Sequence, residues 1–90
     1  MKTIATCIEE CRECARLFRL GRDVEAALSM VEVFEGAQQL LILAPADAQQ
    51  QWAQILMQML DFQERQDWLG VADYMEYELT ELLQNVPAGR

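Results

Sequence analysis

Three cysteines near the start of the chain have the side chains of this sequence that are best suited to metal binding or catalysis. Cys7, Cys11 and Cys14 follow the spacing C-x3-C-x2-C, with which three thiolates can ligate an iron–sulfur cluster. Such a site needs a loop, so that all three sulfurs turn toward one cluster. Here the cysteines recur every three or four residues beside Ile8, which is typical of one helix face. Because an unpaired Cys behaves as a small buried hydrophobe, we predict core packing and no cofactor.

The segment CIEECRECA (7–15) resembles the cysteine-rich helices of bacterial four-helix copper storage proteins. That resemblance implies thiolates that line a bundle core and bind copper(I). The copper proteins repeat cysteines on every helix, whereas here all three lie on the first predicted helix. A copper(I)-binding bundle that uses Cys7, Cys11 and Cys14 is the alternative metal interpretation. Four methionines would supply further soft ligands: Met30, Met57, Met59 and Met75.

The sequence contains no arrangement typical of catalysis. It has no histidine, which removes Ser-His and Cys-His nucleophiles and the di-iron pattern of helical bundles. Its glycines are isolated, so neither a phosphate loop nor a nucleophile elbow is present. Asp73, Glu76 and Glu78 share one predicted helix, but a run of charges on a helix is usually a solvated face rather than a cation site. We predict that the protein is not an enzyme.

Composition restricts the partners. Ninety residues allow one domain with a thin core, and we expect a single domain over 1–90 with a frayed tail at 87–90. Fifteen acidic against seven basic residues give a net charge of -8, which repels nucleic acid and anionic membranes. We therefore expect neither as a partner. The absence of a secretory signal and the odd number of cysteines favour a cytoplasmic location.

Hydrophobic periodicity predicts two helices in the first half of the chain. The first begins near Thr3, a candidate N-cap, and ends at Gly21. The second is capped by Asp23 and stops before Pro45. The side chains predicted to face the core from this second helix are Val24, Ala27, Leu28, Val31 and Phe34.

Two more helices are predicted in the second half, the third after Asp47 and the fourth capped by Asp67. Short connections between helices of similar length predict an all-α fold, an antiparallel up-and-down four-helix bundle. Residues 22–32 and 66–76 are weakly similar, which suggests two related helical hairpins. The predicted core face of the third helix is Trp52, Ile55, Leu56, Met59, Leu60 and Phe62, and that of the fourth is Trp68, Val71, Ala72, Met75, Leu79, Leu82, Leu83 and Val86.

Apolar residues exceed what four thin helices can hide, notably in one stretch, and a second stretch is distinctive for its aromatic residues. VEVFEGAQQLLIL (31–43) is apolar nearly all round, and DWLGVADYMEYEL (67–79) sets three aromatic residues among acids. Tyr and Trp combine a large contact area with a polar tip, as interface anchors commonly do. We therefore predict a partner-binding surface from Trp68, Tyr74, Tyr77, Asp73, Glu76, Phe34 and Leu41.

The second of these stretches follows the pattern W-x-x-L-A-D-x-x-E-Y-E-L, with Val71 in place of the Leu. This pattern resembles small bacterial helical proteins of unknown function, which are similar in size and helical pattern to accessory chaperones of flagellar and type III export. The resemblance implies protein binding and brings no catalytic residue. The matching positions are Trp68, Ala72, Asp73, Glu76, Tyr77, Glu78 and Leu79.

We expect a non-enzymatic helical adaptor or export-chaperone-like protein that shelters an amphipathic helix of a protein partner or pairs with a second copy of itself. Arg12, Arg16, Arg19 and Arg22 gather at one end, and the fourth helix is acidic. A two-fold homodimer would bring these opposite charges together. The excess of acids also leaves open an immunity or inhibitor protein that covers a basic cleft.

Overall fold

The computed structural model describes residues 3–86, and the predicted tail at 87–90 lies outside them. Helix α1 (Ile4–Arg19) begins where Thr3 accepts a hydrogen bond from the backbone N–H of Thr6 at 3.1 Å. It ends before Gly21, whose φ of +77° lies in the left-handed region that glycine adopts without strain. Both predicted ends of the first helix are confirmed.

Helices α2 (Asp23–Leu41) and α3 (Ala46–Glu64) follow. Asp23 is the first residue of α2 rather than its cap, because Arg22 occupies the N-cap position and no side chain accepts a hydrogen bond there. The connection between the helices is closed by Gln49, whose amide donates to the carbonyls of Ile42 and Ala44 at 2.8 and 3.0 Å. Pro45 occupies the N-cap position of α3, where no side chain accepts a hydrogen bond.

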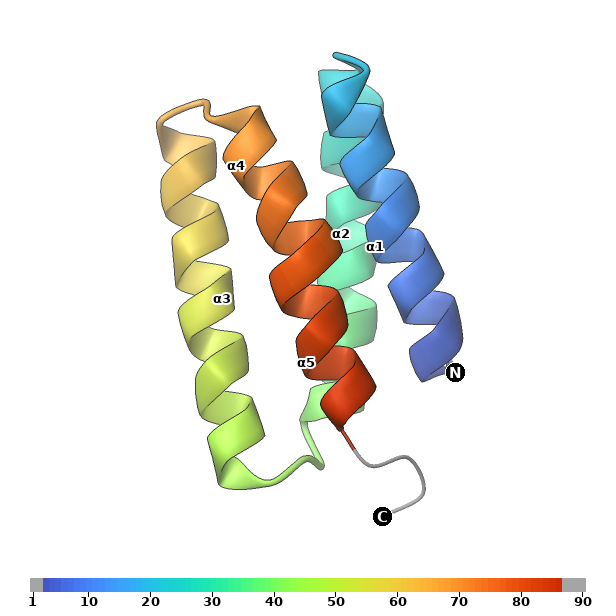
Figure 1. The fold of residues 1–90 in the computed structure, drawn as a ribbon, viewed down its shortest axis with the longest axis vertical. Coiled ribbons are helices and arrows are strands. Elements are labelled where there is room, and N and C mark those ends of the chain that lie inside the picture. Colours follow the sequence, from blue (N-terminus) through green and yellow to red (C-terminus); the bar gives the residue numbers. More distant parts are fainter. Residues whose placement is uncertain (1–2, 87–90) are drawn as a thin grey trace.

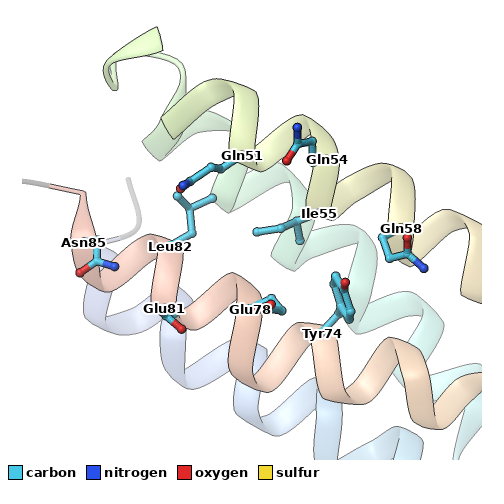
Figure 2. Close-up of a pocket in the computed structure, with 9 residues that line it drawn as sticks. All are labelled: Gln51, Gln54, Ile55, Gln58, Tyr74, Glu78, Glu81, Leu82 and Asn85. Carbon is cyan, nitrogen blue, oxygen red and sulfur yellow. The ribbon is translucent and has the colours of Figure 1, made fainter. Parts of the chain in front are cut away.

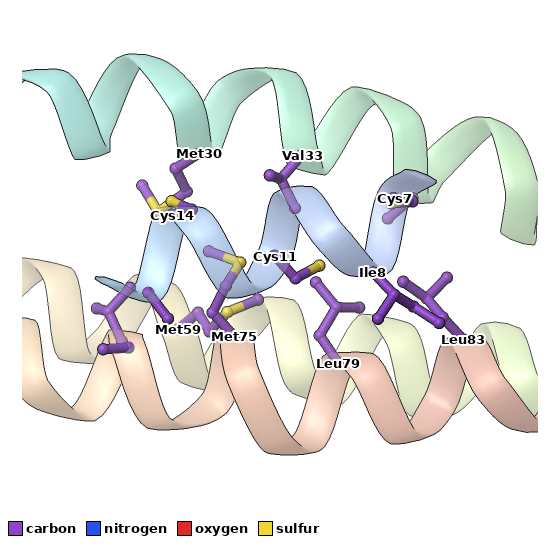
Figure 3. Close-up of a cluster of buried hydrophobic side chains, with 14 of the residues drawn as sticks. Cys7, Ile8, Cys11, Cys14, Met30, Val33, Met59, Met75, Leu79 and Leu83 are labelled. Atoms are coloured by element: carbon purple, nitrogen blue, oxygen red, sulfur yellow. The ribbon is translucent and has the colours of Figure 1, made fainter. Parts of the chain in front are cut away.

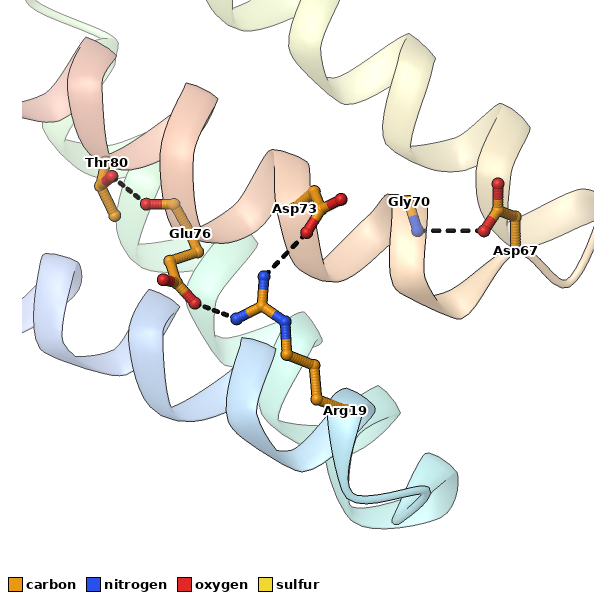
Figure 4. A network of polar contacts seen from close by, with 6 residues as sticks. All are labelled: Arg19, Asp67, Gly70, Asp73, Glu76 and Thr80. Carbon is orange, nitrogen blue, oxygen red and sulfur yellow. Dashed lines mark hydrogen bonds and ion pairs between the residues drawn. The ribbon is translucent and has the colours of Figure 1, made fainter.

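The fourth helix of the bundle is continuous but changes its winding. It comprises α4 (Trp68–Asp73), the π-helical η1 (Tyr74–Leu79) and α5 (Thr80–Asn85), and we call residues 68–85 the C-terminal helix. Asp67 caps it by accepting from the N–H of Gly70 at 3.0 Å, as predicted. The hydroxyl of Thr80 donates to the carbonyl of Glu76 (Figure 4), which satisfies a backbone acceptor where the winding widens.

The helices alternate in direction along the chain (Figure 1) and form the all-α antiparallel four-helix bundle that the sequence predicts. α1 packs against α2 and against the C-terminal helix, which also packs against α3. By contrast, α2 and α3 make few contacts with one another. The bundle therefore has a closed side at α1 and an open side between α2 and α3. Among residues 3–86, no helix has both the length and the apolar character to cross a bilayer.

The two hairpins turn in the same way. Arg22 N–H bonds to Leu17 O at 3.0 Å, and Asp67 N–H bonds to Phe62 O at 2.8 Å. In each turn the preceding residue, Gly21 or Gln66, has a positive φ, so both are Schellman motifs. The matching hydrogen bonds pair Arg22 with Asp67. The sequence alignment of 22–32 with 66–76 pairs Arg22 with Gln66 instead, so the two alignments differ by one residue.

The core is rich in sulfur. All three cysteines are fully buried on α1, and Met30, Met59 and Met75 approach them from the other helices (Figure 3). Leucines of the C-terminal helix complete the cluster beside Ile8. The predicted inward face of the first helix is confirmed.

The predicted core face of the second helix is wrong. Val24, Leu28 and Val31 are exposed, and the buried side of α2 is instead Ala26, Met30, Val33, Ala37 and Leu41. The error arises because α2 carries two apolar stripes and only one can face the core. Leu60, predicted to be buried on α3, is also largely exposed.

Candidate functional site: two grooves beside a closed core

The cysteines point inward in different directions. Figure 3 shows Cys14 near Met30 of α2 and Cys11 on the side of Met75 and Leu79. The Cys14 thiol donates to the carbonyl of Ala26, with the two atoms 3.4 Å apart. Within residues 3–86, no three side chains of the His, Cys, Asp or Glu types are grouped so that they could hold a metal ion.

Their surroundings disfavour thiolate formation. A hydrogen bond with Cys7, followed by burial, raises the pKa of Cys11 well above its ordinary range. Burial raises the pKa of Cys14 to about 11. Because the thiolate is the metal ligand and the nucleophile, these protonated thiols act as packing atoms at neutral pH. This agrees with the prediction of a core role.

Two acids predicted to bind a partner are used inside the molecule. One guanidinium nitrogen of Arg19 lies 2.8 Å from the carboxylate of Asp73, and the other pairs with Glu76 (Figure 4). These ion pairs join the last turn of α1 to the C-terminal helix. The prediction of Asp73 and Glu76 as partner contacts overlooked them, because residues 54 and 57 positions apart give no local signal.

The three aromatic residues predicted to contact a partner also lie in different surroundings. Trp68 stacks on Phe18, with ring centroids 5.7 Å apart and planes 9° apart, so it belongs to the core side. Tyr74 meets the ring of Phe62 edge-on at 5.3 Å. Only Tyr77 is largely exposed, at 60%. The seven predicted contacts therefore do not form one surface.

An apolar groove lies on the open side of the bundle, between α2 and α3. It consists of two adjoining hollows of about 280 and 400 Å³ that share Gln38, Trp52 and Leu56. This apolar groove contains Phe34 and Leu41, the two predicted contacts on the second helix, although Leu41 is only 1% exposed and forms part of the floor. The other lining residues are Glu35, Gln39, Ile42, Gln49 and Ala53.

Bulky side chains hold the walls of the apolar groove apart. The rings of Phe34 and Trp52 meet edge to face, with centroids 5.9 Å apart. The indole N–H of Trp52 donates to the side-chain oxygen of Gln38 at 2.8 Å, so its polar atom is satisfied while its carbon face lines the groove. Trp52 and Leu56 were predicted to face the core, and Gln38 was not among the predicted contacts. The two adjacent glutamines, Gln38 and Gln39, in an otherwise apolar segment were the available signal.

A second hollow, of about 450 Å³, lies between α3 and the C-terminal helix (Figure 2). Ile55 and Leu82 provide its apolar surface, and Tyr74 lies at one end. Glu78 and Glu81 stand on one wall, and neither forms an ion pair with any residue in 3–86. We call this hollow the acidic groove. Its remaining lining residues are Gln51, Gln54, Gln58 and Asn85.

The fold is a small helical bundle with two grooves between its helices. The chain belongs to the family described as Domain of unknown function (DUF8042), which it matches over residues 1–88. Comparison with curated proteins and with solved structures gives no match. The family description names no activity or partner.

Proposed function

We propose that this protein is a non-enzymatic, chaperone-like adaptor that shelters an amphipathic helix of a partner protein in the apolar groove. The observation that supports this most strongly is the separation of α2 and α3, which leaves Phe34, Trp52 and Leu56 along an open channel. A partner helix bound in this groove would supply the contacts that α2 and α3 do not make with each other. Helix-in-groove recognition places an apolar helix face against such a lining.

The groove also indicates the chemistry of the partner helix. Glu35 lies at its edge, and the whole chain carries a net charge of -8. A helix with leucine or isoleucine at positions i, i+3, i+4 and i+7 fits the lining. Lysine or arginine beside that stripe would complement the acidic rim and speed association.

A labelled synthetic peptide with this apolar stripe and flanking lysines tests the proposal by fluorescence anisotropy. We expect saturable binding, and we expect Ala53→Arg to weaken it at least tenfold because the new side chain enters the groove from an exposed position on α3. Ala5→Arg makes the same change at an exposed position of α1 and should bind like the parent. A peptide of equal composition with its apolar residues scrambled should not bind. Equal binding of the two variants, or of the two peptides, would refute the groove assignment.

The acidic groove supports a second candidate function, an inhibitor that covers a basic surface of its target. Glu78 and Glu81 have no cationic partner within residues 3–86, so a lysine or arginine from a target could pair with them. Such binding would weaken steeply with added salt. A Lys-rich peptide without apolar residues distinguishes this function, because it should bind the parent and lose affinity in Glu78→Gln/Glu81→Gln. Salt-independent binding would exclude it.

A further inference from the structure

A row of large aliphatic side chains on the outside of the molecule is left uncovered by the bundle. Leu20, Val24, Leu28 and Val31 are 58%, 76%, 68% and 54% exposed. Val24, Leu28 and Val31 are spaced by four and three residues, so they follow one side of the first half of α2, and Leu20 lies at the end of α1 in the turn before it. We call these four residues the outer stripe. None of them lines the apolar groove.

We propose that the outer stripe is a homodimer interface in which α2 packs antiparallel against α2 of a second copy. The stripe has the three-and-four spacing with which two helices interlock. With a two-fold axis beside Leu28, the Val24 of each copy comes next to the Val31 of the other. A two-fold contact of this kind uses the same surface twice and closes on itself.

Charges at the two ends of the stripe favour this direction over the parallel one. Glu35 lies one turn beyond Val31 on the same side of α2 and has no ion pair among residues 3–86. Antiparallel pairing places it at the start of the partner's α2. There it comes close to Arg22 and to the positive end of the helix dipole, where Asp23 and Glu25 also lie. In a parallel pair, the Glu35 carboxylates of the two copies would face each other and repel.

Arg22 can accept this new partner. Its present ion pair is with Glu25, at 3.7 Å, and both side chains are about 60% exposed. A contact of that length and exposure contributes little. The guanidinium therefore loses little by turning toward the carboxylate of a second copy.

The area that the outer stripe can bury limits the affinity of the dimer. Stable interfaces bury roughly 1,200–2,000 Å² in total, which is more than four aliphatic side chains from each copy provide. The dimer should therefore exchange with monomer as concentration changes. The four residues of the outer stripe do not line the apolar groove, and Glu35 is the residue that both proposals use, so a change within the stripe lets the two proposals fail independently.

Analytical ultracentrifugation over a wide concentration range tests the proposal. The parent should shift from monomer to dimer as concentration rises, and Leu28→Glu should raise the dissociation constant at least tenfold. Met57→Glu is the matched control, because Met57 is 70% exposed on α3, away from the stripe. Helical content and the urea midpoint of both variants should match the parent, since both positions are exposed. A parent that stays monomeric, or equal effects of the two variants, would overturn the proposal.

Charge reversal tests the direction of pairing. Glu35→Arg and Arg22→Glu should each weaken the dimer about threefold or more, since each change introduces repulsion at two symmetric contacts. The double variant should return to within about twofold of the parent. A double variant that is no better than either single change would refute the antiparallel arrangement. In Leu28→Glu the peptide affinity of the apolar groove is measured alongside; Glu35→Arg does not serve here, because Glu35 also lies at the edge of that groove. Leu28→Glu should lose dimerisation and keep peptide binding. Ala53→Arg should lose peptide binding and keep dimerisation, which would show that the two surfaces are distinct.

Discussion

The two sides of this bundle are packed differently. Between α1 and the C-terminal helix, small side chains such as Cys11 and Ala15 are fully buried, and Arg19 pairs with acids across the seam. Between α2 and α3, the rings of Phe34 and Trp52 stand edge to face and the helices separate into a groove. One side holds the fold together, and the other remains accessible.

Side-chain size explains much of this difference. The separation of packed helices depends on the side chains at their contact. Cysteine and alanine on α1 let its neighbours approach closely, and Gly70 allows the same between α4 and α3, where an added Cβ would lie 2.7 Å from the Phe62 ring. Aromatic residues on α2 and α3 fill space at one level and leave hollows beside it. A four-helix bundle can thus keep one seam open without losing its core.

The largest expected effect comes from truncating the closed side. Leu79→Ala removes a fully buried side chain and should lower the free energy of unfolding by about 2–5 kcal/mol. Ile42→Ala, at an exposed position on the groove, should change it by less than about 0.5 kcal/mol. Urea denaturation followed by circular dichroism measures both. Similar losses would show that the two sides contribute equally to stability, contrary to this account.

High pH should loosen the closed side through its thiols. A buried thiol with a raised pKa stays protonated in the folded state while the unfolded state ionises, so its contribution to stability is intact below about pH 8.5. For Cys14 that contribution should be lost progressively up to its folded pKa of about 11. The slope is about 1.4 kcal/mol per pH unit for one thiol. Cys14→Ala should flatten the decline in urea stability between these limits; an unchanged slope would mean that the thiol is solvated.

A smaller effect is expected from the ion pairs of Arg19. Arg19→Ala should cost up to about 1 kcal/mol at low salt and less at high salt, because these pairs are partly exposed to solvent. Arg12→Ala is the matched change on the same helix, since Arg12 forms no ion pair with any residue in 3–86. We expect it to be nearly neutral in the same urea titration. Equal and salt-independent losses would mean that the pairs do not strengthen the seam.

Local sequence signals predicted the elements well. Thr3, Gly21 and Asp67 mark helix ends as expected, because capping depends on residues within one turn. Periodicity also identified the inner face of α1. It failed for α2, where Val24 and Leu28 form a second apolar stripe and periodicity alone cannot show which stripe meets the core.

The grooves were less predictable because they depend on contacts between residues far apart in the sequence. Phe34 and Tyr74 were identified and do lie in grooves. Trp52 and Leu56 were missed as groove residues because the sequence does not show that α2 and α3 separate. Asp73 and Glu76 were assigned to a partner because their pairing with Arg19 arises only in the folded chain.

The indole N–H signals of the two tryptophans give the most direct test that the open side binds a helix. Trp52 borders the apolar groove, and Trp68 is stacked on Phe18 in the closed side. Adding the lysine-flanked amphipathic peptide to ¹⁵N-labelled protein should shift the Trp52 signal to saturation and leave Trp68 in place, and Ala53→Arg should abolish the shift. A Trp52 signal that does not move, or one that moves equally in Ala53→Arg, would contradict the account.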